Sequence, residues 1–138
     1  MSEQQTPPPT VWGTFQARDA RAMIDFLVAV GFEPTAVYAD EADPAVVQHA
    51  QLDWPEGGGV MFGSHKPEGS AWSLQPGSAG FYVVSADPRA VHERVVAAGA
   101  KITREPNETD YGSFEFGFAD PEGNQWSVGT YPGEARKA

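Results

Sequence analysis

The chain has 138 residues, of which 19 are acidic and 9 are basic, so that its formal net charge is −10. This balance disfavours DNA or RNA as a partner, because contacts with phosphate need a basic surface. The sequence has no cysteine, no apolar run of about 18 residues that could span a membrane, and no secretory signal pattern at its N-terminus. We therefore expect a compact cytoplasmic protein without disulfides, thiolate metal ligands or a membrane partner.

Two stretches of the sequence repeat each other, and each predicts a helix. The stretch 19–31 aligns with 87–99, with Asp, Arg-Ala, Val-Ala and Gly at matching positions. In each stretch an Asp suited to the N-cap precedes an apolar stripe, and a Gly follows where the chain needs a left-handed residue. Short apolar strands surround both helices, so we expect two copies of one βαβββ unit, with a site at the junction between the copies.

Turn residues and alternating apolar residues predict how the chain is divided. We expect a mobile N-terminal arm at 1–9, a first βαβββ module at 10–64, a linker at 65–78, a second module at 79–131 and a tail at 132–138. The expected elements are, in chain order, a strand at 11–17, a helix at 20–30, strands at 33–39, 46–53, 59–64 and 80–86, a helix at 89–98, and strands at 101–105, 113–119 and 125–131.

Two motifs carry a family resemblance. The stretch 120–126, Asp-Pro-Glu-Gly-Asn-Gln-Trp, is similar to the Asp-Pro-(Asp/Glu)-Gly hairpin before the last strand of the vicinal-oxygen-chelate superfamily. This superfamily holds glyoxalase I, the fosfomycin- and bleomycin-resistance proteins and the extradiol dioxygenases. His-Ala-Gln-Leu at 49–52, followed by Gly-Gly-Val-Met-Phe-Gly-Ser at 58–64, resembles the glyoxalase-like branch associated with phosphonate operons. The resemblance covers 11–131.

The resemblance implies an α+β fold in which the two βαβββ modules form cupped mixed sheets that pair into a cleft. It also implies a homodimer in which cups from both chains contribute to each site. Metal-dependent members carry His, Gln or Glu on four strands, at positions that correspond here to Trp12, Met61, Gly80 and Ser127. None of these side chains offers an imidazole or a carboxylate, so we expect neither a metal site nor a cofactor.

The three histidines are candidates for replacement metal ligands. We expect His92 on a solvated helix face and His65 exposed in the linker. Alternation along the strand at 46–53 places His49 and Gln51 on one polar face with Val47, and Gln48 on the opposite face. His49 is then either a partly exposed strand residue or a ligand contact, and a single histidine does not make a metal site.

The same alternation sorts the residues of the last strands. Phe114, Phe116 and Phe118 share one face of their strand and are expected in the core together with Trp126. Resemblance to the fosfomycin-resistance proteins places Glu115 in the cup, where it is either a ligand contact or the structural partner of an arginine.

Alternation along the other strands selects further cup residues, and the loops add one more candidate. Trp72, in the linker, is either a plug over the core or a lid on a ligand. The candidate ligand-binding residues are Trp12, Thr14, His49, Gln51, Met61, Trp72, Tyr82, Glu115 and Ser127. A cup lined by such aromatic and polar side chains is typical of a small-molecule pocket.

Two functions remain open. The first is a metal-independent binding protein, similar to the bleomycin-resistance proteins, that sequesters an aromatic, neutral or cationic compound in a dimeric cup. The alternative is a glyoxalase- or dioxygenase-like enzyme, a lyase, isomerase or oxygenase that acts on a small oxygenated substrate. That enzyme would need a metal held by residues not recognised in the sequence, or acid–base chemistry by His49 and Glu115 alone.

Overall fold

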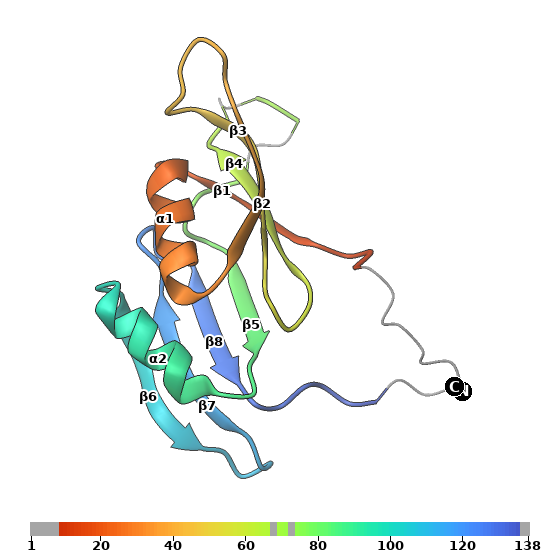
Figure 1. Cartoon of the computed structure of the whole chain (residues 1–138), viewed down its shortest axis with the longest axis vertical. Coiled ribbons are helices and arrows are strands. Elements are labelled where there is room, and N and C mark those ends of the chain that lie inside the picture. Colours follow the sequence, from red (N-terminus) through yellow and green to blue (C-terminus); the bar gives the residue numbers. More distant parts are fainter. Residues whose placement is uncertain (1–8, 67–68, 72–73, 136–138) are drawn as a thin grey trace.

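A computed structural model describes residues 9–66, 69–71 and 74–135 of the chain. It contains two helices and eight strands in the repeated order that the sequence predicts (Figure 1). The elements of the first half are β1 (Gly13–Ala17), α1 (Ala20–Val30), β2 (Glu33–Ala39), β3 (Val47–Asp53) and β4 (Gly59–Ser64). Those of the second half are β5 (Gly80–Val84), α2 (Pro88–Ala97), β6 (Lys101–Glu108), β7 (Phe114–Ala119) and β8 (Gln125–Gly129).

Each half forms its own four-stranded mixed sheet with the same strand order. The first sheet has the order β1-β4-β3-β2 and the second the order β5-β8-β7-β6. In each, the first and last strands of the module run parallel, and Thr14 lies opposite Met61 just as Tyr82 lies opposite Ser127. Two copies of one unit, each with a cupped mixed sheet, therefore build the fold.

The predicted caps hold both helices. The carboxylate of Asp19 accepts a hydrogen bond from Ala22 N at 3.0 Å, and that of Asp87 accepts one from Ala90 N at 3.2 Å. Gly31 follows α1 with φ 131°, a left-handed conformation that a glycine adopts without strain. The local sequence alone thus sets where these helices begin and where α1 ends.

The helices pack against each other and cover one face of the two sheets (Figure 1). Apolar residues from both modules form a single buried cluster between them, which includes Met23, Leu27 and Val95 on the helices and Phe116 on β7. The segments that lead to both ends of the chain leave on the side away from the helices. Within the described residues, neither helix is long and apolar enough to cross a membrane.

A reciprocal pair of glutamates joins the two modules. Glu122, in the hairpin of the second module, accepts hydrogen bonds from Arg18 N at 2.6 Å and Asp19 N at 3.0 Å, next to the start of α1. Glu56, in the matching hairpin of the first module, accepts from Ala86 N at 3.1 Å, next to the start of α2. Because each carboxylate lies near the positive end of the other module's helix, the repeat also fixes how the modules meet.

Local predictions are wrong at several positions. Val47 is fully buried and Gln48 is exposed, since a register irregularity beside Tyr38 and Ala39 shifts the alternation at the start of β3. Strand β6 continues to Glu108 rather than ending at 105, with two register irregularities along its length.

Two further corrections concern His92 of α2 and Phe114 of β7. His92 is half-buried rather than solvated: its Nε2 is buried without a hydrogen-bond partner in the described part of the chain, and its ring meets Phe116 edge-on at 5.1 Å. Phe114 is only half-buried and lies at the edge of the core, where the guanidinium of Arg89 covers its ring at 4.3 Å. Phe116, Phe118 and Trp126 are buried as predicted.

Candidate functional site

A cavity of about 630 Å³ opens on the second module, and we call it the second cup. It is lined by Tyr82 and Val84 of β5, Glu115 of β7, Tyr111 of the β6–β7 turn, and the segment 131–134 that follows β8. The last segment is held in place because Tyr131 N donates to Ser113 Oγ at 3.0 Å and Tyr131 O accepts from Tyr82 Oη at 2.7 Å. Three tyrosines from three different parts of the module thus surround one space.

Glu115 is the buried acid of this cup, with only 4 % of its side chain exposed. Its Oε1 accepts hydrogen bonds from Tyr111 Oη at 2.8 Å and Arg104 Nη2 at 3.3 Å. Its Oε2 lies 3.3 Å from Tyr82 Oη, whose single proton also has the closer acceptor Tyr131 O. Room for the carboxylate comes from Gly129, where a β-carbon would lie 2.5 Å from Glu115 Cγ.

These contacts set the charge of the site. Burial by itself would raise the pKa of Glu115, but hydrogen bonds from the hydroxyls of Tyr111, Ser113 and Tyr82, together with the charge of Arg104, outweigh it and lower the pKa. Burial raises the pKa of Tyr82, and the hydrogen bond to Glu115 raises that of Tyr111. At neutral pH the cup therefore combines a carboxylate with neutral phenol rings.

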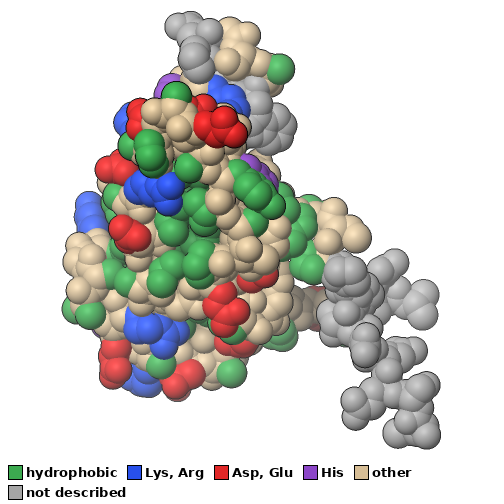
Figure 2. Space-filling view, turned by 45° about the horizontal axis from the view of Figure 1, so that its top comes forward, with side chains coloured by type: hydrophobic (Ala, Val, Ile, Leu, Met, Phe, Trp, Pro, Cys, Tyr) green, Lys and Arg blue, Asp and Glu red, His purple; other side chains and the backbone are tan. Residues whose placement is uncertain are grey.

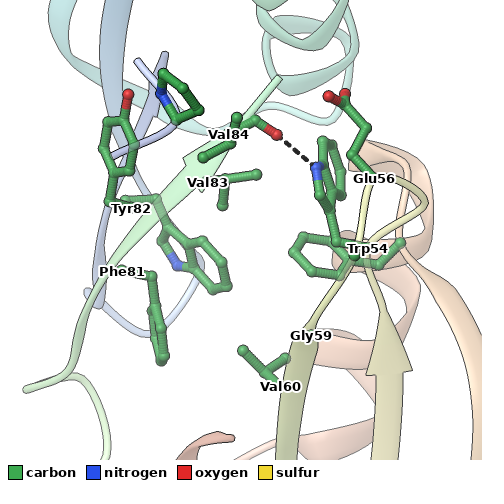
Figure 3. Close-up of a pocket in the computed structure, with 12 residues that line it drawn as sticks. Trp54, Glu56, Gly59, Val60, Phe81, Tyr82, Val83 and Val84 are labelled. Carbon is green, nitrogen blue, oxygen red and sulfur yellow. Dashed lines mark hydrogen bonds between the residues drawn. The ribbon is translucent and has the colours of Figure 1, made fainter. Parts of the chain in front are cut away.

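A second cavity, of about 390 Å³, lies between the modules (Figure 3). Phe81 and Tyr82 of β5 lie on one side of it, and Trp54 and Glu56 of the first module on the other. The indole of Trp54 donates to Val84 O at 2.8 Å and so ties the first module's hairpin to β5. Because Tyr82 also lines the second cup, the two cavities share a wall.

The first module has a smaller cavity, of about 260 Å³, on its own sheet, and we call it the first cup. Thr14, His49 and Met61, three of the residues predicted to bind a ligand, line it together with Gln16 and Lys66. The buried Gln16 accepts a hydrogen bond from Lys66 N at 2.9 Å, and the ring of His49 stacks near that of the exposed Tyr38. The first cup thus carries amide, imidazole and ammonium groups in place of tyrosines and carboxylates.

The remaining predicted residues lie elsewhere. Ser127 lines a further cavity with Thr103, Arg104 and Gly117, and the amide of Gln51 donates to Asp53 at 3.0 Å. Trp12 packs against Gly59, where a β-carbon would lie 3.0 Å from Trp12 Cζ3. Trp72 lies outside the described residues.

The structure therefore divides the predicted site. It brings Tyr82 and Glu115 together in the second cup and collects Thr14, His49 and Met61 in the first. Sequence reasoning missed four residues around Glu115, namely Arg104, Tyr111, Tyr131 and Glu134. Only Tyr111 left a signal, since it stands in the hairpin turn just before the strand of Glu115.

The residues that the resemblance aligns with the family's metal ligands do not fit a metal ion. Trp12, Met61, Gly80 and Ser127 offer no imidazole or carboxylate, and Zn²⁺ or a similar cation needs several such ligands. Among the residues that the structure describes, no group of three or more His, Asp or Glu side chains could hold a metal ion.

On the face seen in Figure 2, Lys and Arg side chains are scattered rather than gathered into a basic patch.

Comparison with known proteins identifies relatives of this fold. A family model described as the glyoxalase/bleomycin resistance protein/dioxygenase superfamily matches residues 10–128. The crystal structure of TioX from Micromonospora sp. ML1 is similar over 86 % of this chain and 97 % of its own, with 24 % identity and a TM-score of 0.68. A superfamily member from Sphaerobacter thermophilus DSM 20745 is similar over 88 % of this chain and 97 % of its own, with 21 % identity and a TM-score of 0.63.

A bleomycin-binding protein, whose structure contains bleomycin, has the same fold. It is similar over 88 % of this chain and 97 % of its own, with 14 % identity and a TM-score of 0.60. A search of curated proteins finds no match. The repeated modules, the motif at 120–126 and the family match together place this chain in the glyoxalase/bleomycin resistance protein/dioxygenase superfamily.

Proposed function

We infer that the protein binds a small aromatic molecule, neutral or positively charged, on its cup face and without a metal ion. The observation that carries this proposal is the buried carboxylate of Glu115 among Tyr82, Tyr111 and Tyr131 in the second cup. A volume of about 630 Å³ is within the range of about 300–1,000 Å³ found for small-molecule pockets. Such pockets hold a ligand with aromatic rings and orient it with a few fixed polar groups, and this cup offers both.

A homodimer fits the exposure of the cup face. Tyr82 is 44 % exposed and Tyr111 58 %, although both rings line the second cup. A second copy that covers these rings would remove apolar surface from water and enclose the ligand. We expect sedimentation of the purified protein at micromolar concentration to give a dimer, and a stable monomer would contradict this. The cytoplasmic location expected from the sequence stays a prediction.

The alternative function, a glyoxalase- or dioxygenase-like enzyme, is less well supported. Acid–base chemistry without a metal would need His49 and Glu115 to act on one substrate. Within one chain, however, His49 lines the first cup and Glu115 the second. The enzyme would therefore depend on a second copy that brings these two residues together, whereas binding needs only the second cup.

Calorimetry on protein dialysed against EDTA tests the proposal. We expect benzyltrimethylammonium and benzyl alcohol to bind, and benzoate to bind weakly or not at all, because Glu115 repels an anion in a partly desolvated site. The same titration after addition of Zn²⁺ or Ni²⁺ serves as the control and should give the same affinities. Binding that requires the metal, or metal-dependent turnover of methylglyoxal with glutathione, would contradict the proposal and favour the enzyme.

A further inference from the structure

We propose that the second cup is a subsite for an alkylammonium group, held by the rings of Tyr82, Tyr111 and Tyr131 and by the carboxylate of Glu115. This inference rests on the proposed function, because it assumes that the cup holds a ligand, and it names the part of the ligand that the cup selects. The charged ammonium group of such a ligand would contact the aromatic rings, which attract cations through their quadrupole.

The three rings are held in position before any ligand arrives. Those of Tyr111 and Tyr131 meet edge to face, with centroids 5.7 Å apart and an interplanar angle of 75°. Each hydroxyl has an oxygen acceptor: Glu115 for Tyr111, Glu134 at 2.9 Å for Tyr131, and the backbone oxygen of Tyr131 for Tyr82. Rings fixed in this way lose little conformational freedom when a ligand binds, so the cup is preorganised.

The charges around the cup favour a cation. Its described lining includes the carboxylates of Glu115 and Glu134 and no Lys, Arg or His side chain. Arg104 reaches Oε1 of Glu115 from the neighbouring cavity, with 45 % of its side chain exposed to solvent that screens its charge. Two carboxylates opposed by one half-exposed guanidinium leave the cup with an excess of negative charge.

The carboxylate of Glu115 is held more loosely at one oxygen than at the other. Oε1 accepts from Tyr111 at 2.8 Å and Arg104 at 3.3 Å, whereas the contact from Tyr82 to Oε2 is 3.3 Å long. Because the proton of Tyr82 has a closer acceptor in Tyr131 O, its hydrogen bond to Oε2 is weak, and the Ser113 hydroxyl is a further donor to the carboxylate. A cation that enters among the rings would be attracted electrostatically to this charged group.

A bulky organic cation fits this site better than a metal ion. A small divalent ion needs several oxygen or nitrogen ligands. The described lining offers two carboxylates, and its phenol hydroxyls of Tyr111 and Tyr131 already donate hydrogen bonds to glutamates. Aromatic side chains around a quaternary ammonium are, in contrast, a general means of recognising a diffuse charge. The chemistry of the cup therefore matches alkylated amines.

A pair of isosteres tests this directly in the unchanged protein. Choline and 3,3-dimethyl-1-butanol have the same shape and differ in carrying a charged nitrogen or a neutral carbon. We expect choline to bind about tenfold tighter or more, since each ring adds to the attraction of a cation. Titrations followed by NMR chemical shifts measure both affinities, and equal affinities for the two compounds would overturn the proposal.

Two variants at Tyr111 separate the effect of its ring on binding from the effect of its hydrogen bond. Tyr111→Phe keeps the ring and loses the bond to Glu115, so it should keep most of the preference for choline. Tyr111→Leu removes the ring and should lose much of this preference, and because Tyr111 is exposed both variants should fold. Tyr38→Leu, which changes an exposed tyrosine of the first module, is the matched control and should have no effect.

The outcomes distinguish this inference from the proposed function. If benzyl alcohol binds in the second cup but choline has no advantage over its neutral isostere, the inference fails and the proposed function stands. If neither the aromatic compounds nor the isosteres bind, the proposed function fails as well. Equal choline preference in Tyr111→Leu and the unchanged protein would also contradict the role of the ring.

Discussion

In the first module, the paired positions on the two parallel strands carry Thr14 and Met61, and in the second module they carry Tyr82 and Ser127. The Asp N-caps of the helices and the strand order around them are the same in both halves. The modules thus share what holds the fold together and differ in what lines the cups. This contrast favours the second cup, with its buried carboxylate and tyrosines, as the part of the molecule that determines ligand selectivity.

The largest difference in stability is expected between the two hairpins. In the second module Asp120 is buried and accepts hydrogen bonds from Trp126 Nε1, from Asn124 N and Nδ2, and from Glu122 N, at 2.8–3.0 Å. Asp120→Ala should lower the free energy of unfolding by about 3 kcal/mol or more, since each buried donor left without an acceptor costs about 1–3 kcal/mol.

The first module offers a matched control for this prediction. Asp53 accepts from Thr35 and Gln51 but is only half-buried, so Asp53→Ala should cost about 1 kcal/mol or less. Urea denaturation of both variants measures the difference. Equal losses of unfolding free energy in the two variants would show that the buried hydrogen bonds of Asp120 do not stabilise the second hairpin more than those of Asp53 stabilise the first.

A smaller and pH-dependent effect is expected at Glu115. Glu115→Gln should cost about 1–3 kcal/mol at neutral pH, because it removes hydrogen bonds to a charged group. The folded pKa lies below the ordinary value of 4.5, so the stability from ionised Glu115 is fully present above that value and is lost as pH falls through the folded pKa. Urea midpoints between pH 7 and 3 should thus fall less steeply for the variant than for the unchanged protein.

The corresponding change in the first cup provides the contrast. His49→Gln changes a half-buried side chain whose ring stacks near the exposed Tyr38, and should change the free energy of unfolding by about 0.5 kcal/mol or less. An acid dependence that is the same in Glu115→Gln and in the unchanged protein would contradict the assignment of an ionised carboxylate to the second cup.

The smallest effects are expected where the modules are alike. Glu56→Gln and Glu122→Gln each remove a charge next to the start of the other module's helix, and each should cost about 0.3–1 kcal/mol. The two losses should be similar and should shrink in high salt, as measured by thermal unfolding. Glu33→Gln, at an exposed position on β2, is the control. Clearly unequal losses of stability in Glu56→Gln and Glu122→Gln would contradict the equivalence of the two contacts between the modules.

The parts of the molecule that could be predicted are those that local sequence determines. Asp19 and Asp87 predict where the two helices begin, because each is an N-cap residue, and the motif at 120–126 predicts the last hairpin. Alternation along β7 placed Glu115 correctly on the face opposite Phe116 and Phe118. It failed at Val47, because a register irregularity depends on the neighbouring strand and leaves no local pattern.

The site itself could be predicted only in part, because its members come from distant segments. The sequence identified Tyr82 and Glu115 as cup residues, but the contribution of Tyr131 depends on how the segment after β8 folds back over the sheet. The bond from Trp54 to Val84 likewise arises only when the modules meet. Periodicity within one strand cannot predict such contacts, since they depend on the packing of several elements.

We propose that the second cup, and not the first, selects an organic cation without a metal. The most direct test is an amide NMR titration of the EDTA-dialysed protein with benzyltrimethylammonium. We expect saturable shifts concentrated at residues 82–84, 111–116 and 129–134, unchanged when Zn²⁺ is added. Shifts concentrated around His49 and Met61, or binding that occurs only with Zn²⁺ present, would contradict it.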